Sequence, residues 1–289
     1  MTPRPFLLPV VAILAGMLSS QLGASLAKGL FPALGAVGAT ALRLVMAAVV
    51  LSIFYRPWRG HLIRHARESG HAWDLAGYGF SLAFMNLAFY LALARAPMGV
   101  VVAVEFIGPL AVALASSRRS ADFLWVVTAV CGLVLLVPWR AGLASADALG
   151  LGLALLSGVG WAGYIVFGTR AGAAHGGNGV AMGMVLGALL ILPVGGPGLV
   201  AASPGWTLLA TGLAVALLSS AIPYVLEIHA MQALPTRTFG IFMSVEPAVA
   251  ALVGLFVLGE HLSLWQGLGI AGVVAASLGS AATSRQSAA

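Results

Sequence analysis

The chain has 289 residues, of which 61% are hydrophobic and only 8% are charged, and its mean hydropathy is +1.03. An ordinary soluble domain carries roughly 25% charged residues, so this composition excludes a water-soluble globular protein. The formal net charge is +6, but the Lys and Arg residues are scattered over connections and form no patch, which argues against a nucleic-acid partner. The lipid bilayer is the expected partner of most of the chain.

Apolar windows bounded by charges, glycines and prolines predict an all-α membrane protein with ten transmembrane helices. Arg4 and the apolar residues after it imitate a signal peptide, but no small-residue cleavage site follows, so the first span is expected to be an uncleaved helix. Connections are short, which leaves no room for a sizeable soluble domain. The approximate spans are 6–27, 36–55, 74–94, 98–116, 121–139, 148–169, 179–197, 206–229, 238–258 and 264–283.

The basic residues are distributed unequally between the two sets of connections. The connections on the side of both termini hold Arg4, Arg56, Arg59, Arg64, Arg67, Arg118, Arg119, Arg170, Arg237 and Arg285. The opposite connections hold only Lys28, Arg95 and Arg140. By the positive-inside rule, we expect a multi-pass protein of the bacterial inner membrane with both termini in the cytoplasm.

Two pairs of prolines indicate an internal repeat. Pro97 and Pro109 stand at the start and middle of the fourth span, and Pro235 and Pro247 stand in the same places of the ninth. Because each unit would hold an odd number of helices, the second unit must enter the membrane from the other side. This predicts two inverted five-helix repeats with a site near the midplane. The predicted units are residues 1–140 and 145–289.

Three carboxylates lie within predicted spans, where an ionisable side chain is costly and needs a partner or water. Glu105 and Glu246 lie at mid-span, each near a proline that frees helix carbonyls and widens the local packing. We expect these two glutamates to hold a proton, a cation or an ammonium group, with a buried interhelical hydrogen bond as the alternative. Glu227 lies toward the end of its span, where it either contributes to the site or reaches interfacial water.

Arg43 is the one strong base predicted within a span. A structural ion pair with an acidic residue of a neighbouring helix is the favoured interpretation, because a buried charge needs a partner. A contact with the carboxylate of a substrate is the alternative.

Several polar and aromatic side chains share helical faces. Asn86 and Tyr90 are four residues apart, and Trp161 and Tyr164 are three apart, so each pair presents one face to a neighbour. Such residues either line a site or act as interhelical hydrogen bonds, packing residues and interfacial anchors. The complete set of candidate substrate-binding residues is Gln21, Asn86, Tyr90, Glu105, Trp161, Tyr164, Tyr224, Glu227 and Glu246.

Two glycine-rich or polar motifs are expected to be structural. Gly267, Gly269 and Gly272 satisfy the GxGxxG pattern but lie in an apolar helix with no preceding strand, so close helix packing is expected and a dinucleotide site is not. Ser263 and Gln266 have the spacing of a capping box at the start of the last span. No metal-ligand spacing and no catalytic triad is found, so we expect no cofactor, no metal and no enzymatic activity.

Several longer stretches of the chain carry a resemblance to a known family. They are GASLAKGLFP at 23–32, TALRL at 40–44, EFIGPLAVALASSRR at 105–119, RAGAAHG at 170–176, LPTRTFG and MSVEPA within 234–248, and LGEHL at 258–262. They resemble the threonine and homoserine exporters of the drug/metabolite transporter superfamily, the EamA-type ten-helix carriers. The resemblance implies export of threonine, homoserine and related small amino acids by proton antiport, from a central cavity lined by the first, third, fourth, sixth, eighth and ninth helices.

A zwitterionic amino acid needs an anionic partner for its ammonium and donors for its carboxylate. Glu105 or Glu246 would serve the first need and would exchange substrate for a proton as the two halves rock around the site. The candidates for the second need are Gln21, Asn86, Tyr90 and Tyr224.

Three alternatives remain open. A carrier of the same fold with a wider range would take aromatic or cationic compounds, with Phe84, Phe89 and Trp161 as an aromatic wall. A passive channel or facilitator is the second alternative, and isolated carboxylates and inverted halves argue against it. A membrane-embedded enzyme is the weakest, since it lacks a catalytic constellation.

Overall fold

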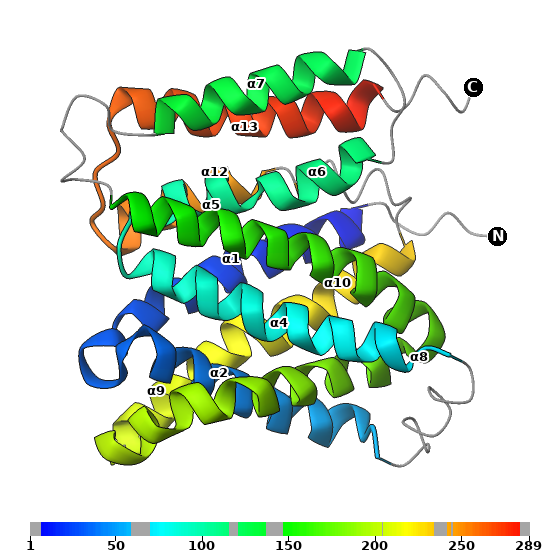
Figure 1. Ribbon diagram of the computed structural model, residues 1–289, viewed down its shortest axis with the longest axis vertical. Helices are drawn as coiled ribbons and strands as arrows, with labels where there is room; N and C mark the ends of the chain where they lie inside the picture. The colour runs from blue at the N-terminus through cyan, green and yellow to red at the C-terminus, as the bar shows by residue number, and fades with distance from the viewer. Residues whose placement is uncertain are drawn as a thin grey trace.

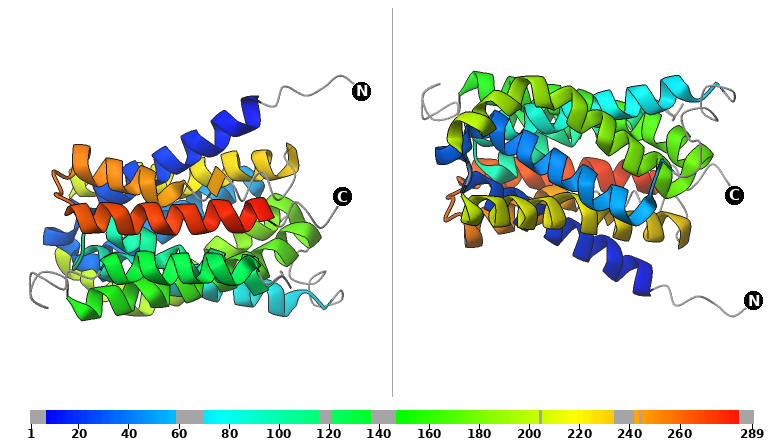
Figure 2. Two further views of the ribbon diagram at one scale, coloured as in Figure 1. Left: turned by 90° about the horizontal axis from the view of Figure 1, so that it is seen from above. Right: turned by 90° about the horizontal axis from the view of Figure 1, so that it is seen from below.

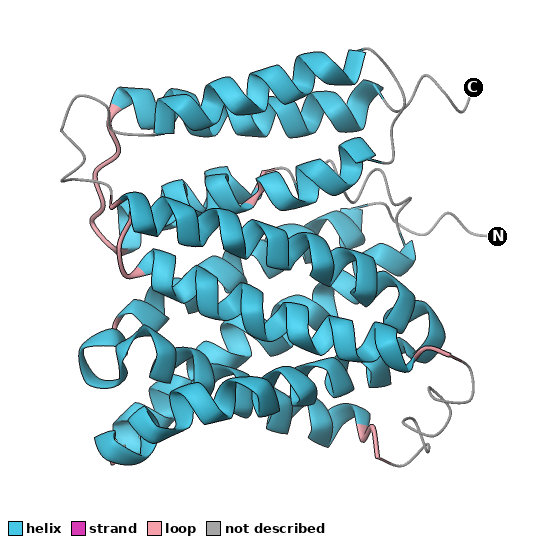
Figure 3. Cartoon of the chain, in the orientation of Figure 1, coloured by secondary structure: helices cyan, strands magenta, loops and turns pink. Residues whose placement is uncertain are grey.

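The computed structural model describes residues 7–58, 70–115, 121–136, 147–203, 205–233, 242–243 and 245–283. Every regular element in these ranges is a helix, as Figure 3 shows, so the predicted all-α class is confirmed. Much of the charge asymmetry falls elsewhere. The basic residues outside the described ranges are Arg4, Arg59, Arg64, Arg67, Arg118, Arg119, Arg140, Arg237 and Arg285.

Figure 1 shows how the helices are arranged. The first part of the chain holds α1 (Leu7–Lys28), α2 (Phe31–Tyr55), α4 (Ala72–Leu93), α5 (Met98–Glu105), α6 (Ile107–Ala115) and α7 (Ala121–Leu136). The second part holds α8 (Ala148–Ala202), α9 (Trp206–Ala216), the π-helical turn η1 (Leu217–Ala221), α10 (Ile222–Ala233), α12 (Glu246–Val257) and α13 (Leu264–Thr283).

In the described part of the chain, five helical segments are long and apolar enough to cross a bilayer: Leu7–Lys28, Phe31–Tyr55, Ala72–Leu93, Ala148–Ala202 and Trp206–Glu227. Shorter apolar helices cover Met98–Val112, Glu246–Val257 and Leu264–Ala276. These lengths and compositions are those of a membrane protein. The number of spans and the inverted repeat stay predictions.

The structure differs from the predicted spans at two places. The fourth span is broken at Phe106, between α5 and α6, immediately after Glu105. The sixth and seventh spans are joined in α8, where Gly176 interrupts the helix with φ 57° and ψ −142°. Gly35 interrupts α2 in a similar way, with φ 65°. Since only glycine adopts such positive φ values at little cost, these two residues allow the chain to change direction without a loop.

The helices are stacked along the long axis of the molecule in Figure 1. Helices α7 and α13 lie side by side at one end, and α2, α9 and the second half of α8 lie at the other. Helices α1, α4 and α10 lie between, and the views of Figure 2 show the long helices running roughly along a common direction. Helix α1 begins and helix α13 ends on the same side of the molecule, which is the right side of Figure 1.

Glycines set the closest helix approaches. A Cβ at Gly160 of α8 would stand 2.9 Å from Met85 of α4, and a Cβ at Gly132 of α7 would stand 2.8 Å from the Gly269 carbonyl of α13. In a bilayer there is no hydrophobic driving force for helices to associate, so the van der Waals contacts at these close approaches stabilise the bundle. The packing interpretation of Gly269 and Gly272 is confirmed, since Gly272 also packs on Gly132.

The capping box of the last helix is confirmed as well. Ser263 N donates to Gln266 Oε1 at 2.9 Å, and Gln266 N donates to Ser263 Oγ at 3.2 Å. These bonds satisfy backbone groups that the first turn of α13 leaves unpaired.

Candidate functional site

Polar side chains from helices distant in sequence meet in the interior of the bundle. We name this set the buried polar cluster, because all its members are 8% exposed or less. Seven helical elements contribute to it, which explains why it forms only in the folded chain. Its members are Gln21 of α1, Arg43 of α2, Asn86 and Tyr90 of α4, Glu105 of α5, Ser157 of α8, Ser219 and Ser220 of η1, and Glu246 of α12.

Arg43 connects α2 to η1 and α4. Its Nε donates to Ser220 Oγ at 3.1 Å, and its Nη2 donates to the Ser219 carbonyl at 2.9 Å. Its Nη1 donates to Asn86 Oδ1 at 2.5 Å, and its Cζ lies 5.3 Å from the centre of the Tyr90 ring. Among the described residues no carboxylate lies within ion-pair distance of this guanidinium, and the ion pair expected for Arg43 stays a prediction.

The π-helical turn explains why carbonyl groups are free to accept from side chains. The Ile222 amide bonds to the Leu217 carbonyl, five residues earlier, and therefore does not bond to Leu218. Pro223 has no N–H, so the Ser219 carbonyl also lacks its helical donor. Ser19 Oγ donates to the Leu218 carbonyl at 2.7 Å, and Arg43 donates to that of Ser219.

Asn86 and Tyr90 share a face of α4, as predicted from their spacing. The Asn86 amide donates to the Leu82 carbonyl at 2.7 Å, which fixes its other end toward Arg43. Tyr90 is fully buried, and its hydroxyl has no partner among the described residues. The two side chains therefore differ, since Asn86 is bonded through both its amide nitrogen and its oxygen, whereas the Tyr90 hydroxyl has no partner among the described residues.

Gln21 and Glu246 form a second pair in the cluster. Gln21 Nε2 donates to Glu246 Oε1 at 3.1 Å, while Gln21 Oε1 and Glu246 Oε2 are buried without a partner among the described residues. Glu246 is the first residue of α12, so the helix dipole favours its negative charge. The pair presents two open acceptors.

Glu105 forms the third contact. Ser157 Oγ lies 2.5 Å from Glu105 Oε1 and 2.9 Å from the Met85 carbonyl. Gly158 allows α8 to approach α5 closely at Glu105, because a Cβ at position 158 would stand 2.6 Å from the Glu105 carbonyl. Glu105 is close enough to Glu246 and Arg43 for their charges to interact. The three contacts thus belong to one electrostatic site.

The aromatic candidates lie beside the cluster. The Tyr164 ring packs on Tyr224, with ring centres 6.1 Å apart, and on Tyr78, with centres 5.3 Å apart. Glu227 is half-buried and interacts electrostatically with Glu246 and with these tyrosines. Trp161 packs edge-on against Phe106, beside Glu105, with centres 5.5 Å apart.

Four members of this region were missed from the sequence. Tyr78 lies eight residues before Asn86 on the same face of α4, so helical spacing was a usable signal. Ser157, Ser219 and Ser220 gave none, because serine is common in membrane helices and its partners lie far away in sequence.

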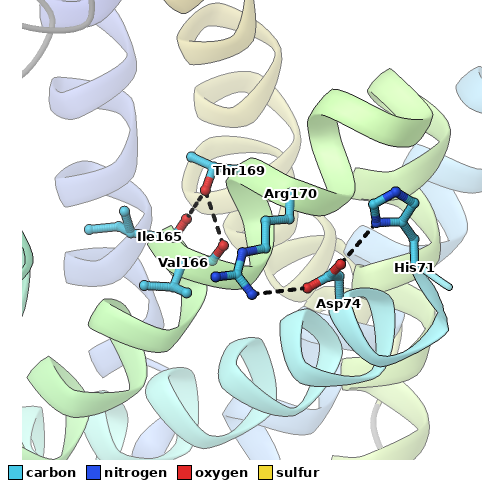
Figure 4. A network of polar contacts seen from close by, with 6 residues as sticks. All are labelled: His71, Asp74, Ile165, Val166, Thr169 and Arg170. Carbon is cyan, nitrogen blue, oxygen red and sulfur yellow. Dashed lines mark hydrogen bonds and ion pairs between the residues drawn. The ribbon is translucent and has the colours of Figure 1, made fainter.

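Two polar networks lie away from the cluster, near helix ends. Figure 4 shows Asp74 at the start of α4, with Asp74 Oδ2 3.0 Å from His71 Nδ1 and Asp74 Oδ1 3.6 Å from Arg170 Nη1. Elsewhere Asp147 caps α8 and pairs with Arg95. Hydrogen bonds from Arg95 and from the Leu149 amide hold the pKa of Asp147 below its ordinary value.

A third network connects α1, α5 and the connection before α13. Lys28 Nζ lies 2.6 Å from Glu260 Oε1, and the Met98 amide donates to Glu260 Oε2 at 2.7 Å. Glu260 N donates to the Gly254 carbonyl at 3.0 Å. Lys28, which the sequence places among the basic residues of the connections, thus has a carboxylate partner in Glu260.

Metal binding is not supported by the described residues, in which no group of three His, Cys, Asp or Glu residues is placed to hold an ion.

Comparison with known proteins decides the family. Two curated relatives are the threonine/homoserine exporters RhtA of Salmonella typhimurium (strain SL1344) and of Escherichia coli (strain K12). Each is 49% identical over 282 residues, which cover 98% of this chain and 94% of the relative. The chain belongs to the threonine/homoserine exporter family. Residues 148–281 also match the EamA-like transporter family.

Membership in the threonine/homoserine exporter family confirms the resemblance seen in the sequence. It also confirms that the chain is a transporter and not an enzyme. A solved crystal structure of a protein 17% identical in sequence aligns with a TM-score of 0.60, covering 96% of this chain and 98% of that chain. At that identity the likeness concerns the fold alone.

Proposed function

We propose that the chain exports threonine, homoserine and related small amino acids across the bacterial inner membrane in exchange for protons. The observation that carries this proposal is the buried polar cluster. Within the described part of the chain, it holds acceptors without a partner at Gln21 and Glu246 and a guanidinium without an anionic partner. Two relatives with 49% identity are named threonine/homoserine exporters. A zwitterion supplies the donors and the anion that such a cluster lacks.

The proposed topology is ten spans in two inverted repeats, residues 1–140 and 145–289. The helix packing supports it. Helix α1 corresponds to the first predicted span and packs on α10, which belongs to the eighth. The first half of α8 corresponds to the sixth span and packs on α4, which corresponds to the third. A two-fold axis between the halves exchanges these two pairs. The same axis maps α5 with α12 and α7 with α13 onto themselves, and both pairs are in contact.

The two ends of the described chain support an even number of spans, because α1 begins and α13 ends at the same end of the bundle (Figure 1). Together with the positive-inside rule, this favours both termini in the cytoplasm.

Glu105 is the proposed proton carrier, with Glu246 as the second candidate. The Ser157 hydroxyl has one hydrogen but lies within hydrogen-bond distance of two acceptors, Glu105 and the Met85 carbonyl. Both contacts are satisfied together only when Glu105 carries a proton and donates it to Ser157. When Glu105 is ionised, Ser157 turns its hydrogen to the carboxylate. The hydroxyl therefore adapts to both states of Glu105.

The proposed ammonium site is the pair of open acceptors on Gln21 and Glu246. A substrate ammonium there would satisfy Gln21 Oε1 and Glu246 Oε2 at once. Because Glu105 interacts electrostatically with Glu246, arrival of the ammonium would favour loss of the Glu105 proton. This coupling is the basis of exchange, with the halves rocking around the site.

The test is transport in proteoliposomes. We expect counterflow of radiolabelled threonine and homoserine, and accumulation driven by a pH gradient. Glu105→Gln should abolish the response to the gradient while the protein stays folded, and unchanged pH-dependent transport would remove Glu105 from this role. Arg170→Gln, at the network of Figure 4, is the control.

The row of Tyr78, Tyr164 and Tyr224 favours one rival, a carrier with a wider range for aromatic or cationic compounds. Competition of threonine counterflow by homoserine, phenylalanine and methyl viologen separates the two functions. Inhibition by homoserine alone supports the amino-acid exporter. Flux that does not saturate would instead indicate a channel.

A further inference from the structure

Arg43 has an unusual environment for a charged side chain inside a membrane protein. It is 6% exposed, and its hydrogen-bond partners within the described residues are an amide, a hydroxyl and a backbone carbonyl. All three are neutral. A buried charge without a counterion is costly, so an anion that arrives at this place is strongly favoured.

The geometry leaves part of the guanidinium available. The three hydrogen bonds use Nε and one N–H on each terminal nitrogen, whereas a guanidinium has five N–H groups. One N–H on each terminal nitrogen is therefore left without a partner among the described residues. A carboxylate with two oxygens is the group that matches such a fork.

The surroundings of Arg43 suit the same ligand. The Tyr90 ring lies under the guanidinium, and its buried hydroxyl has no partner in the described part of the chain. The open acceptors of Gln21 and Glu246 belong to the same cluster, and Glu105 interacts electrostatically with both Glu246 and Arg43. The cluster therefore offers both donors and acceptors.

We propose that Arg43 binds the α-carboxylate of the exported amino acid, and that Asn86, Ser220 and the Ser219 carbonyl hold the guanidinium in the orientation that this requires. The proposal rests on the proposed function and specifies the direction in which the substrate lies. The carboxylate faces Arg43 and Tyr90, and the ammonium faces Gln21 and Glu246. Asn86, expected to touch the substrate, is a positioning residue.

A purely structural role predicts something different. In that role Arg43 only satisfies the Ser219 carbonyl that Pro223 leaves without a donor. Its loss would then affect folding, or the transport of every substrate, without regard to whether the substrate carries a carboxylate.

The experiment compares threonine with threonine amide, which keeps the ammonium and the side chain but lacks the negative charge. Wild type, Arg43→Gln, Arg43→Lys and Asn86→Asp are reconstituted, and KM and maximal rate of counterflow are measured for both compounds. Asn86→Asp keeps Arg43 and its contact with position 86 but places a fixed carboxylate beside it. Arg170→Gln is the control for loss of an arginine elsewhere.

We expect wild type to prefer threonine, and Arg43→Gln and Asn86→Asp to raise the KM for threonine at least about tenfold, the usual weight of a charge-assisted hydrogen bond. The KM for threonine amide should stay nearly unchanged, and Arg43→Lys should recover part of the preference. Size-exclusion chromatography tests whether the Arg43 variants fold. If they do not, the Asn86→Asp variant alone tests the proposal.

Equal changes in KM for both compounds, or a wild type that does not distinguish them, would overturn the role of Arg43. Absence of counterflow of both threonine and homoserine in wild type is a different failure, because it overturns the proposed function and this inference together.

Discussion

Lys28 and Glu260 form an ion pair across 232 residues of sequence, with Nζ 2.6 Å from Oε1. The second oxygen of Glu260 accepts from the Met98 amide at the start of α5. The Glu260 side chain is 13% exposed and that of Lys28 25%, so the pair is only partly screened by solvent. One carboxylate thus connects the end of α1, the start of α5 and the connection between α12 and α13.

Glu260→Gln should lower the thermal stability of the purified protein. The substitution keeps an acceptor for Met98 but removes the charge that attracts Lys28, and a partly buried pair lies between exposed and fully buried ones, so the loss is about 1–2 kcal/mol. A double-mutant cycle with Lys28→Gln measures the coupling by thermal unfolding in detergent. Arg95→Gln at the exposed pair with Asp147 should change little. Additive effects of the Lys28 and Glu260 substitutions would show that the pair contributes nothing.

Ser157→Ala should change the pH profile of threonine transport more than its maximal rate. The substitution removes the one hydroxyl that lies between Glu105 and the Met85 carbonyl, and that hydroxyl adapts to both states of the carboxyl group. Counterflow across a series of pH values measures the midpoint. Thr169→Ala, on the same helix, is the control, because the Thr169 hydroxyl donates only to carbonyls of its own helix. A midpoint equal to that of wild type would contradict a role of Ser157 in proton coupling.

Gly158→Ala should destabilise the protein, whereas Gly152→Ala on the same helix should not. A Cβ at Gly158 would meet the Glu105 carbonyl at 2.6 Å, so α8 must move away from α5, and overpacking of this kind costs about 1–3 kcal/mol. A Cβ at Gly152 meets nothing within 4 Å, and alanine favours the helix. The melting temperatures of the two variants give the comparison. Equal changes in melting temperature for Gly158→Ala and Gly152→Ala would show that α8 and α5 can move apart at this contact at little cost.

Gly176→Ala should destabilise α8 at its bend by about 1–2 kcal/mol, because an L-residue at φ 57° is strained even where space is available. Gly172→Ala is the matched control, since it lies four residues earlier, has no positive φ and meets nothing within 4 Å. Thermal unfolding and the yield of monodisperse protein are the measurements. If both variants behave alike, the backbone of Gly176 is not a constraint on the fold.

The sequence predicted what depends on local composition. Hydropathy predicted the apolar helices, because each membrane-spanning helix must be apolar along its own length. The cost of a buried charge identified Glu105 and Glu246 as interior residues. Helical spacing placed Asn86 and Tyr90 on one face. These features need no knowledge of which helices are neighbours.

Partners distant in sequence were beyond such reasoning. Arg43 was expected to find a carboxylate, but its partners Ser219 and Ser220 are common residues 176 and 177 positions away. The pair of Lys28 and Glu260 is concealed by the same separation. The merging of two spans at Gly176 was missed because residues 170–178 were assigned to a connection between spans, and only the backbone shows a positive φ at Gly176.

The π-helical turn Leu217–Ala221 has a consequence for the length of the chain at this point. A π turn is equivalent to one residue inserted into an α-helix, and successive residues of an α-helix are rotated by about 100° about its axis. Removing a single residue from this turn would restore a regular helix, but it would rotate Tyr224 and Glu227 away from the partners that they now face. The number of residues in this turn thus determines which side chains face the site, and homologous chains that keep the site must keep the same number of residues here.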